Sequence, residues 1–296
     1  MSTVKIPEEL KAGVPQTTWG KTLSVTPVVM TVIATLLAGL ASSEMTTAQY
    51  DRAYAAQQQS KAGDQWSYFQ AKKMRAALQR NTLDLLQATA DVQPLDPAKF
   101  PAPAGEAVLA ALQKGELPAA PTAAPLDANV QTALAAIESQ KPENEISNLL
   151  AQVKDETLAA ALTAAREHAT AFDDTTKPVN QAIDQLEKSL PADDKSLRRD
   201  LTYARLRYTS ARYDTEARLN QTIANLLELQ VRKNNISAER HHRRSGKFFF
   251  GMLAAQAAVI VSTLAMAARQ RNLLWTLAAV AGIAAIIFAI YVYLRV

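Results

Sequence analysis

Apolar residues concentrate in three stretches of the chain, one near its start and two at its end. These stretches cover residues 22–42, 248–268 and 273–294. An α-helix rises about 1.5 Å per residue and the hydrocarbon core of a bilayer is about 30 Å thick, so about twenty apolar residues cross it. Each stretch reaches that length. We therefore expect three transmembrane helices, the last two joined by a tight turn at 269–272.

The polar segment between these stretches shows helical periodicity near both of its ends. Residues 43–90 contain no proline and only one glycine, Gly63, and therefore predict one outgoing helix. Residues 193–247 predict a returning helix that begins with Asp193 as its N-cap. Because the two helices have similar lengths, we expect them to form an antiparallel stalk. The outgoing helix has a face with the three-and-four spacing of a packed helix, made of Tyr68, Ala71, Arg75, Leu78, Thr82 and Leu85.

The middle of the chain predicts a small helical region at the far end of this stalk. Prolines and alanines dominate residues 91–127, which is typical of a semi-rigid connector. In the distal region 128–192, three helices are expected from the periodicity and from the prolines that precede two of them, at 128–140, 143–172 and 179–190. With an N-terminal tail at 1–21, the predicted fold is an all-α membrane protein with three transmembrane helices, a long antiparallel helical stalk and a small distal helical bundle.

The first apolar stretch also has an alternative interpretation, as a cleaved secretory signal. Lys21 precedes its apolar core, and the small residues at 39–41 resemble a cleavage site. Retention as a transmembrane helix is favoured because the leader is long, carries Glu8 and Glu9, and precedes an apolar run longer than the usual signal.

The side of the membrane that holds the central domain depends on the lysines and arginines near the apolar stretches. Their distribution favours a cytoplasmic central domain under the positive-inside rule. The short turn at 269–272 carries two arginines, which argues for the opposite orientation. A periplasmic central domain therefore stays open.

Basic residues cluster immediately before the second apolar stretch. The formal net charge of the chain is only +4, and much of the excess lies in Arg240, Arg243, Arg244 and Lys247. Such a cluster is typical of a collar that flanks a transmembrane helix. A sharper hypothesis is that this collar faces the lipid and recognises anionic lipid head groups, since groups of four to eight Lys/Arg beside a span attract them. Nucleic acid is not expected as a partner.

Candidate chemistry along the chain is sparse. The sequence has no cysteine, which excludes disulfides, thiolate metal sites and cysteine nucleophiles. His168, His241 and His242 lack the spacing of a metal site, and no glycine-rich phosphate loop occurs. The three apolar stretches contain no Asp, Glu, Lys, Arg or His, the residues that mark ion and proton paths. We therefore expect neither an enzyme nor a transporter, and no cofactor or metal.

The most distinctive motif lies in the outgoing helix, where residues 62–72 read Ala-Gly-Asp-Gln-Trp-Ser-Tyr-Phe-Gln-Ala-Lys. Trp66, Tyr68 and Phe69 are candidate packing anchors, with Trp66 and Phe69 expected against the returning helix. The alternative is an oligomer or partner contact, where aromatic residues are enriched. A first apolar stretch, this motif and a closing two-helix hairpin resemble the bacterial membrane family catalogued as domain of unknown function 4337. The resemblance implies a retained first span and a multi-pass protein of the bacterial inner membrane, and it brings no activity or catalytic residues.

These patterns together predict a non-enzymatic integral membrane protein. Its role would be that of an oligomeric scaffold or a partner-binding helical module, with the lipid bilayer, further copies of itself and an unidentified protein as partners. The alternative function is a membrane sensor or signalling subunit with a helical-bundle domain. A conditionally inserting pore-former is a third class.

Overall fold

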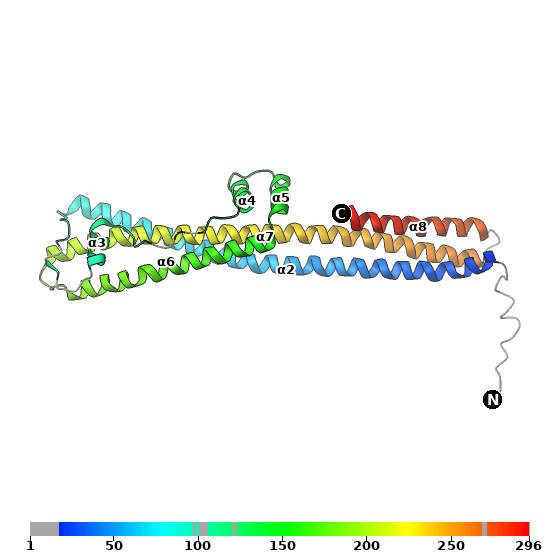
Figure 1. Ribbon diagram of the computed structural model, residues 1–296, viewed down its shortest axis with the longest axis horizontal. Helices are drawn as coiled ribbons and strands as arrows, with labels where there is room; N and C mark the ends of the chain where they lie inside the picture. Colours follow the sequence, from blue (N-terminus) through cyan, green and yellow to red (C-terminus); the bar gives the residue numbers. More distant parts are fainter. Residues whose placement is uncertain are drawn as a thin grey trace, which may run out of the picture. The chain divides into compact units, whose positions relative to one another are not determined.

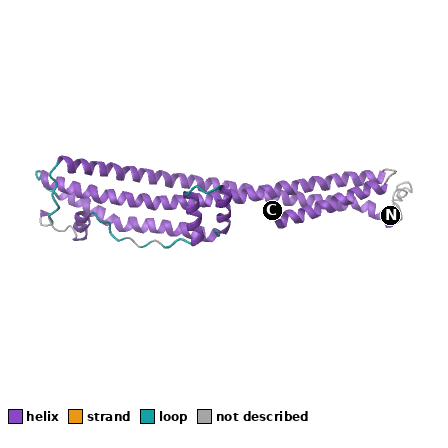
Figure 2. Ribbon diagram, turned by 90° about the horizontal axis from the view of Figure 1, so that it is seen from above, coloured by secondary structure: helices purple, strands orange, loops and turns teal. Residues whose placement is uncertain are grey.

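The computed structural model describes residues 18–96, 99–100, 106–119, 122, 124–267 and 271–295. These residues are almost entirely helical, and no strand occurs among them (Figures 1 and 2). The predicted all-α class is therefore confirmed. The first seventeen residues of the predicted N-terminal tail, and residues 269 and 270 of the predicted turn at 269–272, lie outside the described residues. The helices are α2 (Thr18–Thr89), α3 (Glu106–Lys114), α4 (Ala128–Glu138), α5 (Glu143–Gln152), α6 (Asp155–Ser189), α7 (Lys195–Ala267) and α8 (Arg271–Arg295).

Three of these helices are long enough and apolar enough to cross a membrane, as the sequence predicts. They are α2, α7 and α8, and in each the apolar part coincides with one of the three apolar stretches. Large apolar side chains on these parts point outward, among them Leu36, Ile260 and Ile287, which are 63%, 62% and 62% exposed. Outward-facing apolar side chains are the arrangement that a lipid environment stabilises, because lipid leaves no cost for exposing them.

The chain divides into two compact units, and α2 and α7 each contribute to both. The first unit contains Met1–Tyr54 and Asn234–Val296. Its core is built from small side chains that allow the helices to approach closely. The buried residues include Ala34 and Ala41 of α2, Ala255, Ala258 and Ser262 of α7, and Ala278 and Ala285 of α8.

Polar contacts fix how α2 meets α7 inside the first unit. The Ser245 hydroxyl donates to the carbonyl oxygen of Ala41 at 2.7 Å. His241 Nδ1 lies 2.5 Å from Glu44 Oε2, and Arg52 lies 3.8 Å from Glu239. Since the residue number on α7 falls as the number on α2 rises, the two segments run in opposite directions.

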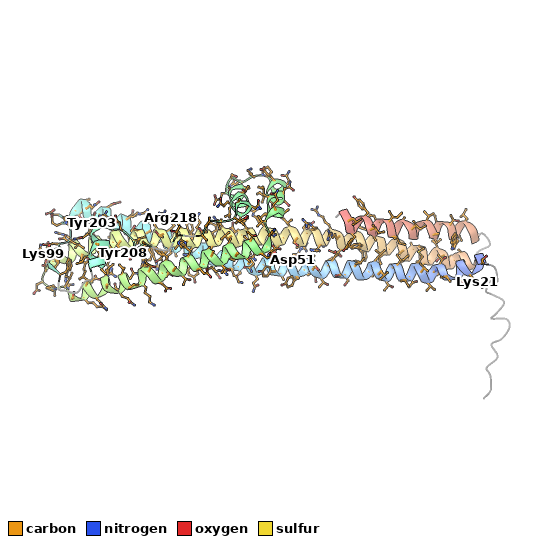
Figure 3. The ribbon with its side chains drawn as sticks, viewed as in Figure 1. Lys21, Asp51, Lys99, Tyr203, Tyr208 and Arg218 are labelled. Atoms are coloured by element: carbon orange, nitrogen blue, oxygen red, sulfur yellow. The ribbon has the colours of Figure 1, made fainter. Side chains whose placement is uncertain are left out.

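The second unit, Ala55–Lys233, combines the end of α2, the start of α7 and the intervening helices. A core cluster joins the connector, α3, the end of α6 and the start of α7, with fully buried Tyr208 among its members (Figure 3). It also contains Leu95, Phe100, Val108, Leu112, Ile183, Leu186, Leu197 and Leu201. Helices α4 and α5 lie beside α7 through polar contacts such as Asn225 to Glu138 at 3.3 Å and Arg232 to Glu143 at 3.2 Å.

The sequence predicts two helices in this part of the chain, 143–172 and 179–190. The end of the first and the start of the second are both wrong. The first helix ends early, because Val153 is extended at the C-cap of α5 and Lys154 is extended at the N-cap of α6. The side chain of Lys233 donates to the carbonyl oxygen of Val153 at this break. Helix α6 then continues through Pro178, although proline costs a backbone hydrogen bond inside a helix. Buried Phe172 and Thr176 before Pro178, and Ile183 and Leu186 after it, show that one packed face continues past the proline.

One face of α2 is assigned to packing by the sequence, but this face is exposed within the chain. Tyr68, Leu78 and Leu85 are 58%, 59% and 63% exposed, and the other members of that face are exposed as well. Alanines recur along the buried face of α2 instead, every seven residues at 34, 41, 48, 55 and 62, with Ala76 two heptads further on; Met30, Leu37 and Gln58 are buried as well. The prediction is therefore wrong for a single chain.

Candidate functional site

The interface between α2 and α7 in the second unit is a zipper of small residues. Ala55, Ala62 and Ala76 of α2 are at most 3% exposed, and α7 contributes Ser210, Ala217, Ala224 and Val231, again seven residues apart. The Ser210 hydroxyl donates to the carbonyl oxygen of Ala76 at 3.3 Å, which fixes the register. Counting fourteen residues in opposite directions from this contact places Ala62 opposite Ala224. Side chains this small let two helix backbones approach closely, so a larger residue at these positions would not fit between them.

The three candidate aromatic anchors fall on different sides of this zipper. The Trp66 indole donates to Glu228 Oε1 at 2.7 Å, across to α7. Phe69 meets the Trp66 ring edge to face, with 5.4 Å between ring centroids. Tyr68 lies on the exposed side, so the structure brings Trp66 and Phe69 together and leaves Tyr68 apart.

A row of ion pairs runs beside the zipper and joins α2 to α7. Asp214 is buried, and its carboxylate lies 2.7 Å from Lys73 of α2 and 2.5 Å from Arg218, one turn further along α7 itself. Hydrogen bonds from these two cations lower the pKa of Asp214 from 3.8 to about 2. Glu216 is likewise buried and accepts a hydrogen bond from Lys72. Buried carboxylates with cationic partners on another helix are costly to separate, so they specify the register of α2 against α7.

The most prominent apolar surface of the second unit lies on the opposite side of α2. It consists of exposed residues that alternate three and four positions apart, which is the a/d spacing of a coiled coil. We call this surface the outer stripe; its members are Ala71, Met74, Leu78, Asn81 and Leu85. Met74, Leu78 and Leu85 are 66%, 59% and 63% exposed, so the outer stripe is available to a partner.

The basic collar lies in the first unit, on the part of α7 that precedes its apolar stretch. Arg240 and Arg243 are exposed, and Arg243 Nε donates to Glu239 at 2.9 Å. Arg244 is partly buried and lies 4.0 Å from Glu44, the carboxylate that also contacts His241. Lys247 is half-buried where the apolar stretch begins. Sequence reasoning found the cations but missed the two carboxylates that pair with them, because Glu44 is 197 residues away from His241.

This geometry defines a class: an all-helical protein with three helices able to span a membrane and a helical unit that carries an exposed coiled-coil-like stripe. Residues 19–115 match a family model described as Domain of unknown function (DUF4337). The resemblance stated from the sequence is therefore confirmed for this segment, which contains the aromatic anchors and the whole outer stripe. No curated protein and no solved structure matches the chain.

Proposed function

We propose that this protein is a non-enzymatic scaffold of the bacterial inner membrane that assembles with further copies of itself through the outer stripe of α2. In this proposal the apolar parts of α2, α7 and α8 cross the bilayer. The long remainders of α2 and α7 form an antiparallel stalk, which the alanine zipper and the ion pairs of Asp214 and Glu216 hold in register.

The observation that carries the proposal is the exposure of the outer stripe. Met74, Leu78 and Leu85 remain in contact with water although alanines occupy the buried face of the same helix. Fully burying a side chain of this size contributes roughly 1.5–3 kcal/mol. A dimer buries six such side chains, each about 60% exposed in the single chain, and therefore gains roughly 6–11 kcal/mol of burial free energy.

That amount is comparable to the roughly 4–15 kcal/mol that two freely diffusing proteins lose in translational and rotational freedom. The outer stripe alone would therefore give a weak dimer in solution. Anchoring in a membrane confines the copies to one surface and aligns them, and effective concentration then strengthens weak contacts. A short stripe is sufficient under those conditions.

A second copy also fits the chemistry of the outer stripe. Copies inserted in the same orientation bring their α2 helices together in parallel, so each residue meets its own counterpart about a two-fold axis. A surface that meets itself this way cannot carry charge at its centre, and the outer stripe has none. Its single polar member, Asn81, falls at a d position of this spacing and would meet its own counterpart in the second copy.

Background-free cysteine crosslinking tests the proposal, because the natural chain has no cysteine. Leu78→Cys is compared with Ala77→Cys, which is also exposed but lies about 100° further round the helix. After mild oxidation in native membranes, we expect a disulfide-linked dimer from Leu78→Cys and mainly monomer from Ala77→Cys. Equal yields from both variants, or monomer from both, would contradict self-assembly through the outer stripe.

A further inference from the structure

A groove in the first unit lies between α2 and α7, where the apolar stretch of α2 ends and that of α7 begins. Its volume is about 570 Å³, within the roughly 300–1,000 Å³ of sites that hold small organic ligands. No residue of α8 lines it. Phe248, which directly precedes the lining residue Phe249, belongs to the same core cluster as Val292 of α8. Phe249 and Phe250 are instead 49% and 68% exposed.

The two ends of the groove differ in chemistry. Toward the apolar stretches its walls are apolar and include Phe249, Phe250 and Met252 of α7. At the other end Met45 of α2 lies level with His242, because Glu44 contacts His241, and His242 and Ser42 provide polar groups. The apolar walls thus extend along the helices toward the apolar stretches, and the polar end lies within the basic collar.

The surroundings of the polar end carry an excess of positive charge. Segments 43–54 and 234–247 together hold five Lys/Arg and only three carboxylates. Arg243 and Lys247 do not line the groove themselves; they follow the lining residues His242 and Gly246 in sequence and so point about 100° away from them around α7. Both cations also share a helix face with Phe250, because positions three and seven apart are neighbours on an α-helix.

We infer that this groove binds an anionic phospholipid, with one acyl chain along Phe249, Phe250 and Met252 and the phosphate beyond the His242 end, held by Arg243 and Lys247. The inference rests on the membrane anchoring in the proposed function, and is independent of self-assembly through α2. An amphiphile with one negative head and an apolar tail matches both ends of the groove at once. The acyl chain of a zwitterionic lipid would cover the apolar walls, but its head group would not neutralise the excess positive charge. A free phosphate would leave the apolar walls exposed to water.

Gly246 provides a sharp test because it lies in the wall of the groove and has open space around it. A Cβ atom added there would meet nothing within 4 Å, so a larger side chain enters the groove without a backbone clash. Gly39 offers a matched control, since it belongs to the same unit, has equally open space and does not line the groove. Leucine at either position replaces a helical glycine by a better helix former, so neither variant should lose its fold.

The experiment measures lipids retained by the purified full-length protein in a neutral detergent, using native mass spectrometry. The protein is equilibrated with equal amounts of phosphatidylglycerol and phosphatidylcholine that carry identical acyl chains. We expect the natural protein and Gly39→Leu to retain one phosphatidylglycerol per chain in preference to phosphatidylcholine. Gly246→Leu should lose the retained lipid.

A charge variant tests the head-group contacts separately. One cation near an anionic lipid contributes about fivefold in affinity, so Arg243→Gln/Lys247→Gln should reduce the preference for phosphatidylglycerol by about 25-fold. It should still retain lipid in the groove. The matched control Lys177→Gln/Lys188→Gln removes the same charge from exposed positions of α6 in the second unit and should keep the preference.

Three results would overturn the inference. The first is equal retention of both lipids by the natural protein, and the second is lipid retention by Gly246→Leu as strong as that by Gly39→Leu. The third is a loss of oligomer mass in Gly246→Leu with unchanged lipid, which would mean that a second copy fills the groove. The first two results do not depend on whether Leu78→Cys forms a dimer, so the two proposals can fail independently.

Discussion

The alanine zipper between α2 and α7 predicts that leucine introduced at two adjacent positions of α2 has opposite effects on stability. Ala62 is completely buried against α7, whereas Gly63 is exposed, and a Cβ atom added to it would meet nothing within 4 Å. Ala62→Leu inserts three extra carbon atoms where two helix backbones meet. Overpacking of this kind costs about 1–3 kcal/mol. Gly63→Leu instead removes a helical glycine from a solvated face, which should stabilise the unit by about 0.5–1 kcal/mol.

The assay uses Trp66 as a local reporter, because its indole bridges α2 and α7 one helical turn after Ala62. Replacing Trp19 and Trp275 by phenylalanine in every variant leaves Trp66 as the only tryptophan. Urea unfolding of the full-length protein in detergent, followed by Trp66 fluorescence, then gives the midpoint and slope for each variant. We expect the midpoint of Ala62→Leu to fall and that of Gly63→Leu to rise. An unchanged midpoint for Ala62→Leu would refute the close approach of the two helices.

Two further predictions concern the ion pairs and α6. The pKa of Asp214 is lowered in the folded protein, so its carboxylate stabilises the fold at pH values above the unfolded pKa of 3.8. This contribution to the free energy of unfolding, about 2 kcal/mol, should be lost as the pH falls toward about 2. Asp214→Asn should flatten stability between pH 4 and pH 2 in the same fluorescence assay, while the exposed control Asp84→Asn should leave that slope unchanged. Pro178→Ala restores a backbone donor inside α6 and should stabilise it by up to about 3 kcal/mol. A lower unfolding midpoint for Pro178→Ala would show that α6 needs the proline geometry.

The apolar helices were predictable because membrane-length hydropathy is a sum over about twenty residues, and no single side chain decides it. The all-helical character follows for a similar reason, since good helix formers dominate the polar segment and glycine is rare. Local boundaries depend on tertiary contacts instead. Pro178 lies inside α6 because residues on both sides of it are buried, and the break at Val153 coincides with a hydrogen bond from Lys233, eighty residues away.

The inner face of α2 was missed because its residues give the weakest hydrophobic signal. Leu78 and Leu85 dominate a periodicity judged by apolar size, yet they face outward, and Ala48, Ala55 and Ala62 form the buried seam. The regular seven-residue spacing of alanine was the available signal. The ion pairs beside the alanine zipper could not be predicted from the sequence, because Lys73 and Asp214 are separated by 141 residues.

One arrangement recurs on both parts of α2, and it supports the interpretation of the outer stripe as a contact surface. In the apolar stretch small residues such as Ala34 face the neighbouring helices, while larger ones such as Leu36 face outward. Between residues 71 and 85 Ala76 faces α7, and Leu78 again faces outward. Small residues set the distance between helices in both places, and the larger apolar side chains meet whatever surrounds the pair. For the apolar stretch, we propose lipid as the surrounding. Around Leu78 the helix is flanked by charged residues, which is why we propose the surface of another copy as the contact there.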